Sequence, residues 1–136
     1  MKKKLQLLVL GLVFVVGILL DLAPIRVPDG IDKIYHFIGF SLITILAIST
    51  YISFFGKKWI NLFLMSLLIF GGIFGGISEF LQKYVAIRDC SFQDWITNLC
   101  GVTLIVVIAF LNGSRERKKI ESNESQFEFK DLPINL

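Results

Sequence analysis

Charged residues make up only 18% of this 136-residue chain, and it holds just two cysteines, three prolines and one histidine. Two cysteines cannot build a disulfide framework or a four-cysteine zinc site. The net charge of +3 comes from short clusters beside apolar runs and forms no basic face, so we expect no nucleic-acid partner. With 54% hydrophobic residues the chain is too apolar for a disordered protein. Length and composition together indicate one domain of an integral membrane protein.

Four long apolar runs account for most of the chain. A bilayer core of about 30 Å needs about 20 helical residues, and alternation of polar and apolar residues is absent. We therefore predict an all-α membrane protein, with four transmembrane helices in a compact bundle within residues 1–112. The expected helices cover about residues 5–23, 34–55, 59–82 and 94–112. Residues 113–136 are polar and are expected to form a mobile cytoplasmic tail.

Lysine and arginine predict the orientation, because cytoplasmic loops carry an excess of both. Of the basic residues that flank the apolar runs, nine fall on the side of the two termini and four fall on the other side. Both termini of this multi-pass membrane protein are therefore expected in the cytoplasm. Trp59 and Trp95 lie where aromatic residues anchor helices at the membrane interface.

Polar residues gather at the outer ends of the second, third and fourth predicted helices, where membrane depth makes them costly and usually functional. The group comprises Asp32, Lys33, His36, Glu79, Gln82, Arg88, Asp94 and Asn98. Within each helix these residues share one face, and the face continues onto glycine at Gly39, Gly75 and Gly101. Glycine lets helices approach closely in lipid. We expect three helices packed at glycine, with a polar site above that contact and open to the outside.

The chemistry of this site has several interpretations. His36 with Asp32 one turn away is a candidate general base, with Glu79 as a second acid, or else a hydrogen-bonded link between helices. Lys33 and Arg88 are candidate anion ligands, or else neutralise nearby carboxylates. Asp32, His36, Glu79 and Asp94 could supply metal ligands, but with one histidine and no thiolate pair we predict no metal site and no cofactor.

The same residues resemble a known family. Asp32-Lys33-x-x-His36-Phe37-x-x-Phe40 resembles the opening motif of VanZ-like membrane proteins. A second motif follows as Glu79-x-x-Gln82, then Arg88, then Asp94-x-x-x-Asn98-x-x-Gly101. The resemblance covers about residues 5–112, and departs from the family at Val85-Ala86-Ile87, where proline and glycine are usual. It implies a role in the bacterial cell envelope and a link to low-level resistance to teicoplanin, a lipid-tailed glycopeptide.

These observations predict an outward-facing site for an anionic amphiphile, such as a cell-wall lipid precursor, a polyprenyl phosphate or the lipoglycopeptide. The expected ligand-binding residues are Lys33, His36, Glu79, Gln82, Arg88, Asp94 and Asn98. One alternative is a membrane-embedded hydrolase or transferase that uses Asp32, His36 and Glu79. Another is a small structural or transport subunit in which the polar residues only hold helices together.

Overall fold

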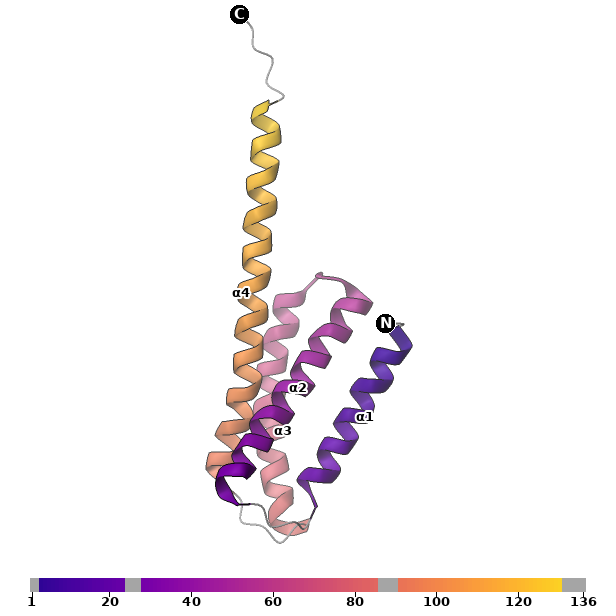
Figure 1. Cartoon of the computed structure of the whole chain (residues 1–136), viewed down its shortest axis with the longest axis vertical. Helices are drawn as coiled ribbons and strands as arrows, with labels where there is room; N and C mark the ends of the chain where they lie inside the picture. The colour runs from indigo at the N-terminus through magenta and orange to yellow at the C-terminus, as the bar shows by residue number, and fades with distance from the viewer. Residues whose placement is uncertain (1–2, 24–27, 86–90, 131–136) are drawn as a thin grey trace, which may run out of the picture. The chain divides into compact units, whose positions relative to one another are not determined.

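The structure, a computed structural model, describes residues 3–23, 28–85 and 91–130, and within these ranges it contains helices and no strand (Figure 1). The four helices are α1 (Lys3–Asp21), α2 (Asp29–Phe55), α3 (Ile60–Val85) and α4 (Phe92–Lys130). The all-helical class predicted from the sequence is confirmed. The chain divides into two units, Met1–Val106 and Val107–Leu136, and α4 contributes to both.

All four helices are long and apolar enough to span a membrane. They bury mostly polar residues and expose apolar ones, the opposite of a water-soluble protein. The buried apolar residues of the described chain are Ile48, Leu64, Val102 and Val106, whereas eight polar or charged residues are buried. Large apolar side chains cover the outside of every helix. Lipid is the solvent in which such a surface is stable, so the chain is a multi-pass membrane protein.

Two helix boundaries differ from those expected by five residues or more, and the others differ by at most three. α2 begins at Asp29 and not at residue 34, because the Pro28 carbonyl accepts the N–H groups of Ile31 and Asp32 at 2.9 and 3.0 Å and so starts the first turn. α4 continues to Lys130, so the expected helix end at residue 112 is wrong, and the polar residues up to Lys130 are helical. Its arginine, lysine, glutamate and glutamine residues favour helix, and no proline occurs in it.

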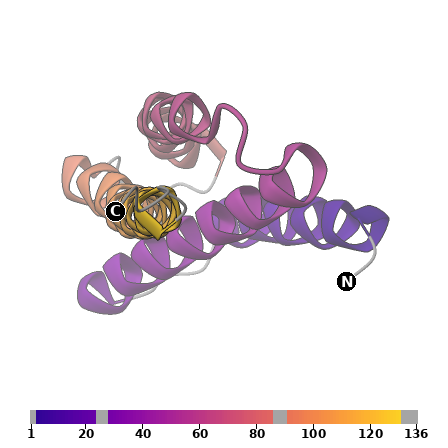
Figure 2. The ribbon, with the colours of Figure 1, turned by 90° about the horizontal axis from the view of Figure 1, so that it is seen from above.

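Within the first unit, α1, α2 and α3 run alternately in opposite directions, and α1 packs against both α2 and α3 (Figure 1). Seen from above, α2 is inclined relative to α3 (Figure 2). This order brings together the end of α1, the start of α2, the end of α3 and the start of α4. The polar residues at those four helix ends therefore share one end of the unit.

A short turn joins α2 to α3. Gly56 has a φ of 67°, which a residue without a side chain adopts at little cost, and its N–H donates to the Ile52 carbonyl at 2.8 Å. Tyr51 fixes the turn from α2, because its hydroxyl donates to the Lys58 carbonyl at 2.5 Å and its ring stacks on Phe63. Trp59 is 69% exposed, consistent with an interfacial anchor.

Glycine permits close packing of the start of α4 against α3. A Cβ at Gly71 would lie 2.9 Å from Val102, and a Cβ at Gly75 would lie 3.3 Å from Asn98. Trp95 lies against the same face and donates its ring N–H to the Gly72 carbonyl at 2.8 Å, a role that the sequence did not predict. Gly75 therefore lies at a helix contact below Glu79, as expected.

The α2–α4 contact depends on Gly101, where a Cβ would lie 2.6 Å from the Phe37 carbonyl oxygen. The hydroxyl of Ser41 donates to the Gly101 carbonyl at 3.3 Å across the same contact. The expectation for Gly39 is wrong, because nothing lies within 4 Å of the Cβ position there. Gly39 lines a pocket instead.

Candidate functional site

The structure buries most of the predicted site. His36, Glu79, Gln82, Asp94 and Asn98 are all at most 6% exposed. They lie at the end of the first unit where four helix termini meet, together with Asp21, Asp32, Lys33 and Ser78, and these nine residues are called the polar cluster below. Arg88 lies outside the described residues, as do Asp89 and Cys90.

His36 lies at the centre of the polar cluster. Its Nε2 atom is 3.8 Å from a carboxylate oxygen of Asp32 and 3.8 Å from Oε1 of Glu79. Its Nδ1 atom is 3.6 Å from a carboxylate oxygen of Asp21. Each ring nitrogen therefore faces at least one carboxylate, and the three carboxylates come from three different helices. The i,i+4 spacing of Asp32 and His36 brings this pair together as expected.

Asp21, at the end of α1, is a site residue that the sequence reasoning missed. Its carboxylate accepts a hydrogen bond from the Ser78 hydroxyl and another from Nε2 of Gln82 at 2.7 Å. The backbone carbonyl of Asp21 accepts a further one from the same amide at 3.2 Å. The sequence contained one indication of this role. Asp21 ends the first apolar run, and in helices that alternate in direction the ends of the first and third helices lie on the same side of the membrane. The predicted three-helix site is therefore a four-helix site.

Glu79 links the end of α3 to the start of α4. Its Oε2 atom accepts the backbone N–H of Ser91 at 3.2 Å, and the Ser91 hydroxyl accepts the backbone N–H of Asp94 at 3.3 Å. Carboxylates are stabilised near a helix N-terminus, where backbone N–H groups are unpaired and the dipole is positive. The sequence Ser91-Phe92-Gln93-Asp94 therefore starts α4 and positions Glu79 by the same contacts.

Lys33 supplies a positive charge, with its ammonium 3.6 Å from a carboxylate oxygen of Asp94. Among the described residues of the polar cluster, four carboxylates thus face one lysine and one histidine. This part of the site is therefore acidic on balance. Buried acidic groups need positive charge nearby to be stable, and Lys33 and His36 supply it here.

Asn98 is one of the expected ligand-binding residues. It is fully buried one turn beyond Asp94, yet neither its side-chain oxygen nor its nitrogen has a hydrogen-bond partner among the described residues. Oε1 of Glu79 and Oδ1 of Asp94 also lack one in that part of the chain. Oε1 of Glu79 lies 3.8 Å from His36 Nε2 and Oδ1 of Asp94 lies 3.6 Å from the Lys33 ammonium, so both face an ion-pair partner. Hydrogen bonds among the described residues leave both side-chain atoms of the buried Asn98 unsatisfied, which is rare in folded proteins.

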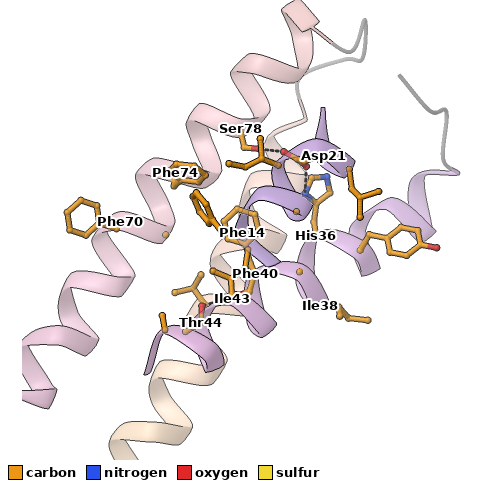
Figure 3. A pocket seen from close by; sticks show the side chains of 18 of the residues that line it. Phe14, Asp21, His36, Ile38, Phe40, Ile43, Thr44, Phe70, Phe74 and Ser78 are labelled. Atoms are coloured by element: carbon orange, nitrogen blue, oxygen red, sulfur yellow. Dashed lines mark hydrogen bonds and ion pairs between the residues drawn. The ribbon is translucent and has the colours of Figure 1, made fainter. Parts of the chain in front are cut away.

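A pocket of about 800 Å³ opens beside the polar cluster, between α1, α2 and α3 (Figure 3). Asp21, Asp32, His36 and Ser78 line its polar end. The rest of the wall is apolar and includes Phe14, Ile43, Phe70 and Phe74. Phe14 and Phe74 approach each other across it, with ring centroids 5.2 Å apart. One cavity thus joins a polar end to a long apolar wall.

Comparison with known proteins adds no assignment: no family model, no curated protein and no solved structure matches this chain. The fold and site themselves define the class, a multi-pass membrane protein with a buried acidic polar cluster beside an amphipathic pocket.

Proposed function

We propose that this is a VanZ-like protein of the bacterial cell envelope that binds an anionic amphiphile at an outward-facing site. The candidate ligands are a cell-wall lipid precursor, a polyprenyl phosphate and a lipoglycopeptide such as teicoplanin. The family resemblance supports the cellular context. The ligand class is supported by one observation above all, the pocket with a polar end and an apolar wall.

The two ends of the pocket suit the two parts of an amphiphile. An acyl or prenyl chain would lie along Phe14, Phe70 and Phe74, since ligand sites are mostly apolar with a few polar groups that fix orientation. The head group would lie at the end formed by Asp21, Asp32 and His36. Lys33 would supply positive charge for an anion, and Arg88, the second cation expected from the sequence, lies outside the described residues.

Gly39 provides a direct test because it lines the pocket and has open space at its Cβ position. We expect Gly39→Leu to fill part of the pocket without a clash, and to keep the melting temperature within about 3 °C of the wild type. The measurement is extraction and mass spectrometry of lipids that co-purify in detergent. One amphiphile should be retained by the wild type and reduced at least tenfold in the variant.

The matched control is Gly11→Leu, on an exposed part of α1 where nothing lies within 4 Å of the Cβ position and which does not line the pocket. This variant should retain the same lipid as the wild type. Equal lipid content in Gly39→Leu and Gly11→Leu, with both proteins folded, would show that the pocket is not the binding site.

The orientation has its own test. With both termini cytoplasmic, the connection between α3 and α4, which includes Cys90 in the sequence, would face outside, whereas Cys100 belongs to the membrane-spanning part of α4. A thiol reagent that cannot cross membranes should label Cys90 in intact cells and leave Cys100 unlabelled, although Cys100 is free and exposed on the helix surface. Labelling of Cys90 only after lysis would reverse the orientation.

A membrane-embedded hydrolase or transferase is the second candidate, favoured by the placement of His36 between carboxylates. The Asp21 carboxylate 3.6 Å from Nδ1 can fix the tautomer and orientation of the ring, and Nε2 is then the nitrogen that would accept a proton from a substrate. An enzyme would change the lipid composition of cells that express it, and His36→Gln would abolish that change. A binding protein would leave the total cellular composition the same in both strains.

A further inference from the structure

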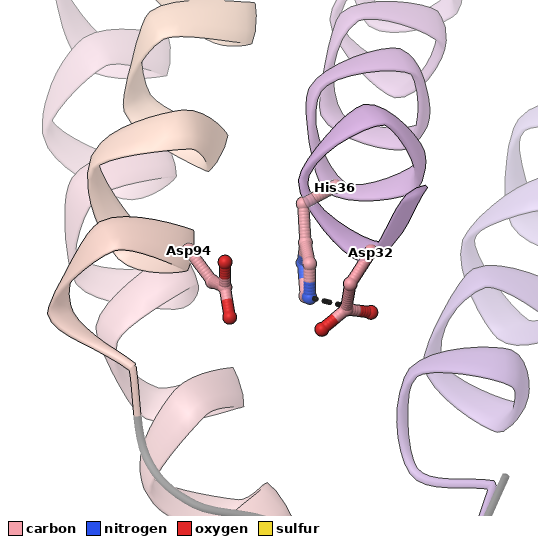
Figure 4. Close-up of side chains that lie close together, drawn as sticks. All are labelled: Asp32, His36 and Asp94. Carbon is pink, nitrogen blue, oxygen red and sulfur yellow. Dashed lines mark ion pairs between the residues drawn. The ribbon is translucent and has the colours of Figure 1, made fainter. Parts of the chain in front are cut away.

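We propose that Asp32, His36 and Asp94, with Glu79 as a fourth ligand, bind a single divalent metal ion. One ligand atom from each of the first three residues lies within 4.8 Å of the others, and His36 and Asp94 are buried. Figure 4 shows Asp32 and Asp94 on either side of the His36 ring. Metal binding goes beyond the proposed function, because it requires no amphiphile.

The spacing suits an ion after a small adjustment. Zinc binds nitrogen and oxygen at about 2.0–2.2 Å, which places neighbouring ligand atoms about 3–3.5 Å apart. The observed separations of 3.8 Å from His36 Nε2 to Asp32 and to Glu79 exceed this by less than about 1 Å. The ligand atoms of Asp32, His36 and Asp94 lie within 4.8 Å of one another, so closing the site requires movements of about 1–2 Å, including a turn of Asp94 away from the Lys33 ammonium that lies 3.6 Å from it.

A second observation, independent of the cluster's composition, points to a ligand. Glu79 is 2% exposed, and its Oε1 atom has no hydrogen-bond partner in the described part of the chain. That atom faces the same His36 nitrogen as Asp32, so an oxygen with an unused acceptor is aimed into the proposed site. The other oxygen of Glu79 is held by the Ser91 N–H, which fixes the carboxylate in this direction.

Asp21 acts as a positioning residue for the proposed site. Metal-bound histidines commonly donate their second ring N–H to a carboxylate, which sets the tautomer and orients the ring. Asp21 lies 3.6 Å from His36 Nδ1 and is itself held by Ser78 and Gln82. Nε2 is then the nitrogen left to bind the metal, on the side where Asp32 and Glu79 lie.

The donor set limits the identity of the ion. One imidazole and several carboxylates are ligands for zinc, manganese or ferrous iron, whereas calcium and magnesium prefer oxygen alone. A cation would also offset the surplus of negative charge among the described residues of the polar cluster, where low dielectric makes like charges expensive. From the sequence these four residues were candidate ligands, but one histidine without a thiolate pair is a weak ligand set, and no metal site was predicted.

The test uses zinc as the probe and the full chain in detergent after treatment with a chelator and removal of lipid. Isothermal titration calorimetry with zinc chloride should give one site per chain with a micromolar or lower Kd. Saturating zinc should raise the melting temperature by roughly 5–10 °C, because a ligand that binds only the folded state stabilises it.

Isosteric variants distinguish the metal ligands from residues that do not bind the metal. Glu79→Gln and Asp94→Asn should each weaken zinc binding at least tenfold and reduce the melting shift accordingly. Glu116→Gln is the matched control, the same substitution at an exposed position beyond Val106, and should leave the affinity unchanged. Asp21→Asn should weaken binding less than Asp94→Asn does, as a positioning role requires.

X-ray absorption on the zinc-loaded wild type keeps the test independent of how the variants fold. It should show nitrogen and oxygen ligands only, with the signature of one imidazole. Failure of the folded wild type to bind zinc, a sulfur ligand at about 2.3 Å, or full affinity in both isosteric variants would each overturn the proposal. Because lipid is absent, none of these results depends on whether the pocket binds an amphiphile.

Discussion

Gly101→Ala should destabilise the protein by about 3 kcal/mol, which corresponds to a fall of roughly 10 °C in melting temperature. The added Cβ would lie 2.6 Å from the Phe37 carbonyl oxygen and 3.3 Å from the Ser41 nitrogen, both backbone atoms of α2. Backbone cannot rotate away as a side chain can, so α4 must shift and lose the Ser41–Gly101 hydrogen bond. Thermal unfolding in detergent, followed by circular dichroism, measures the effect.

Gly113→Ala is the control for this substitution, in the same helix with nothing within 4 Å of its Cβ position. It should leave the melting temperature unchanged or raise it, because alanine favours helix over glycine by up to about 1 kcal/mol. Gly101→Ala is therefore expected to lower the melting temperature, and Gly113→Ala is not. A Gly101→Ala protein that melts with the wild type would mean that α2 and α4 are not in close contact.

Asp21→Leu should cost about 3 kcal/mol as well, for a different reason. The substitution removes the acceptor for the Ser78 hydroxyl and the Gln82 amide, and Gln82 is only 1% exposed. Each buried donor left without a partner costs about 1–3 kcal/mol. α1 has no fully buried residue of its own, so Asp21 holds a large share of its attachment to α3.

A double variant checks that the Asp21–Gln82 pair is the cause. Gln82→Leu alone should be destabilising, whereas Asp21→Leu with Gln82→Leu should recover at least about 1 kcal/mol relative to the sum of the single changes. Gln93→Leu, at an exposed position near the start of α4, is the control and should be nearly neutral. Strict additivity of the two single changes would contradict a direct interaction.

Much of this fold could be predicted from the sequence, because a long apolar run in a bilayer is stable mainly as a transmembrane helix. The expected helix ends at Phe55 and near the start of α3 agree with the structure within a residue, since glycine and lysine interrupt the apolar pattern there. The end of α4 was not predictable in this way. The predicted end depended on the apolar pattern, which stops near residue 112. The polar residues beyond it have high helix propensity, and the helix continues through them.

The site was predictable where neighbours along one helix define it, as for Asp32 with His36. It was not predictable where the partner comes from another helix. Asp21 was treated as the end of a run, and its bonds to Ser78 and Gln82 depend on how α1 packs against α3. Gly39 was mispredicted for the same reason. Its spacing places it on the polar face of α2, but whether that face meets a helix or a pocket depends on how the helices pack.

Native mass spectrometry of the wild-type protein released from detergent tests the central claim, that this membrane protein binds an amphiphile beside its polar cluster. The spectrum should show the 15.4 kDa chain carrying one additional molecule with the mass of a lipid-tailed anion. That adduct should be absent from Gly39→Leu and present in Gly11→Leu. A spectrum of the bare chain alone, from protein that is folded and purified in mild detergent, would contradict the claim.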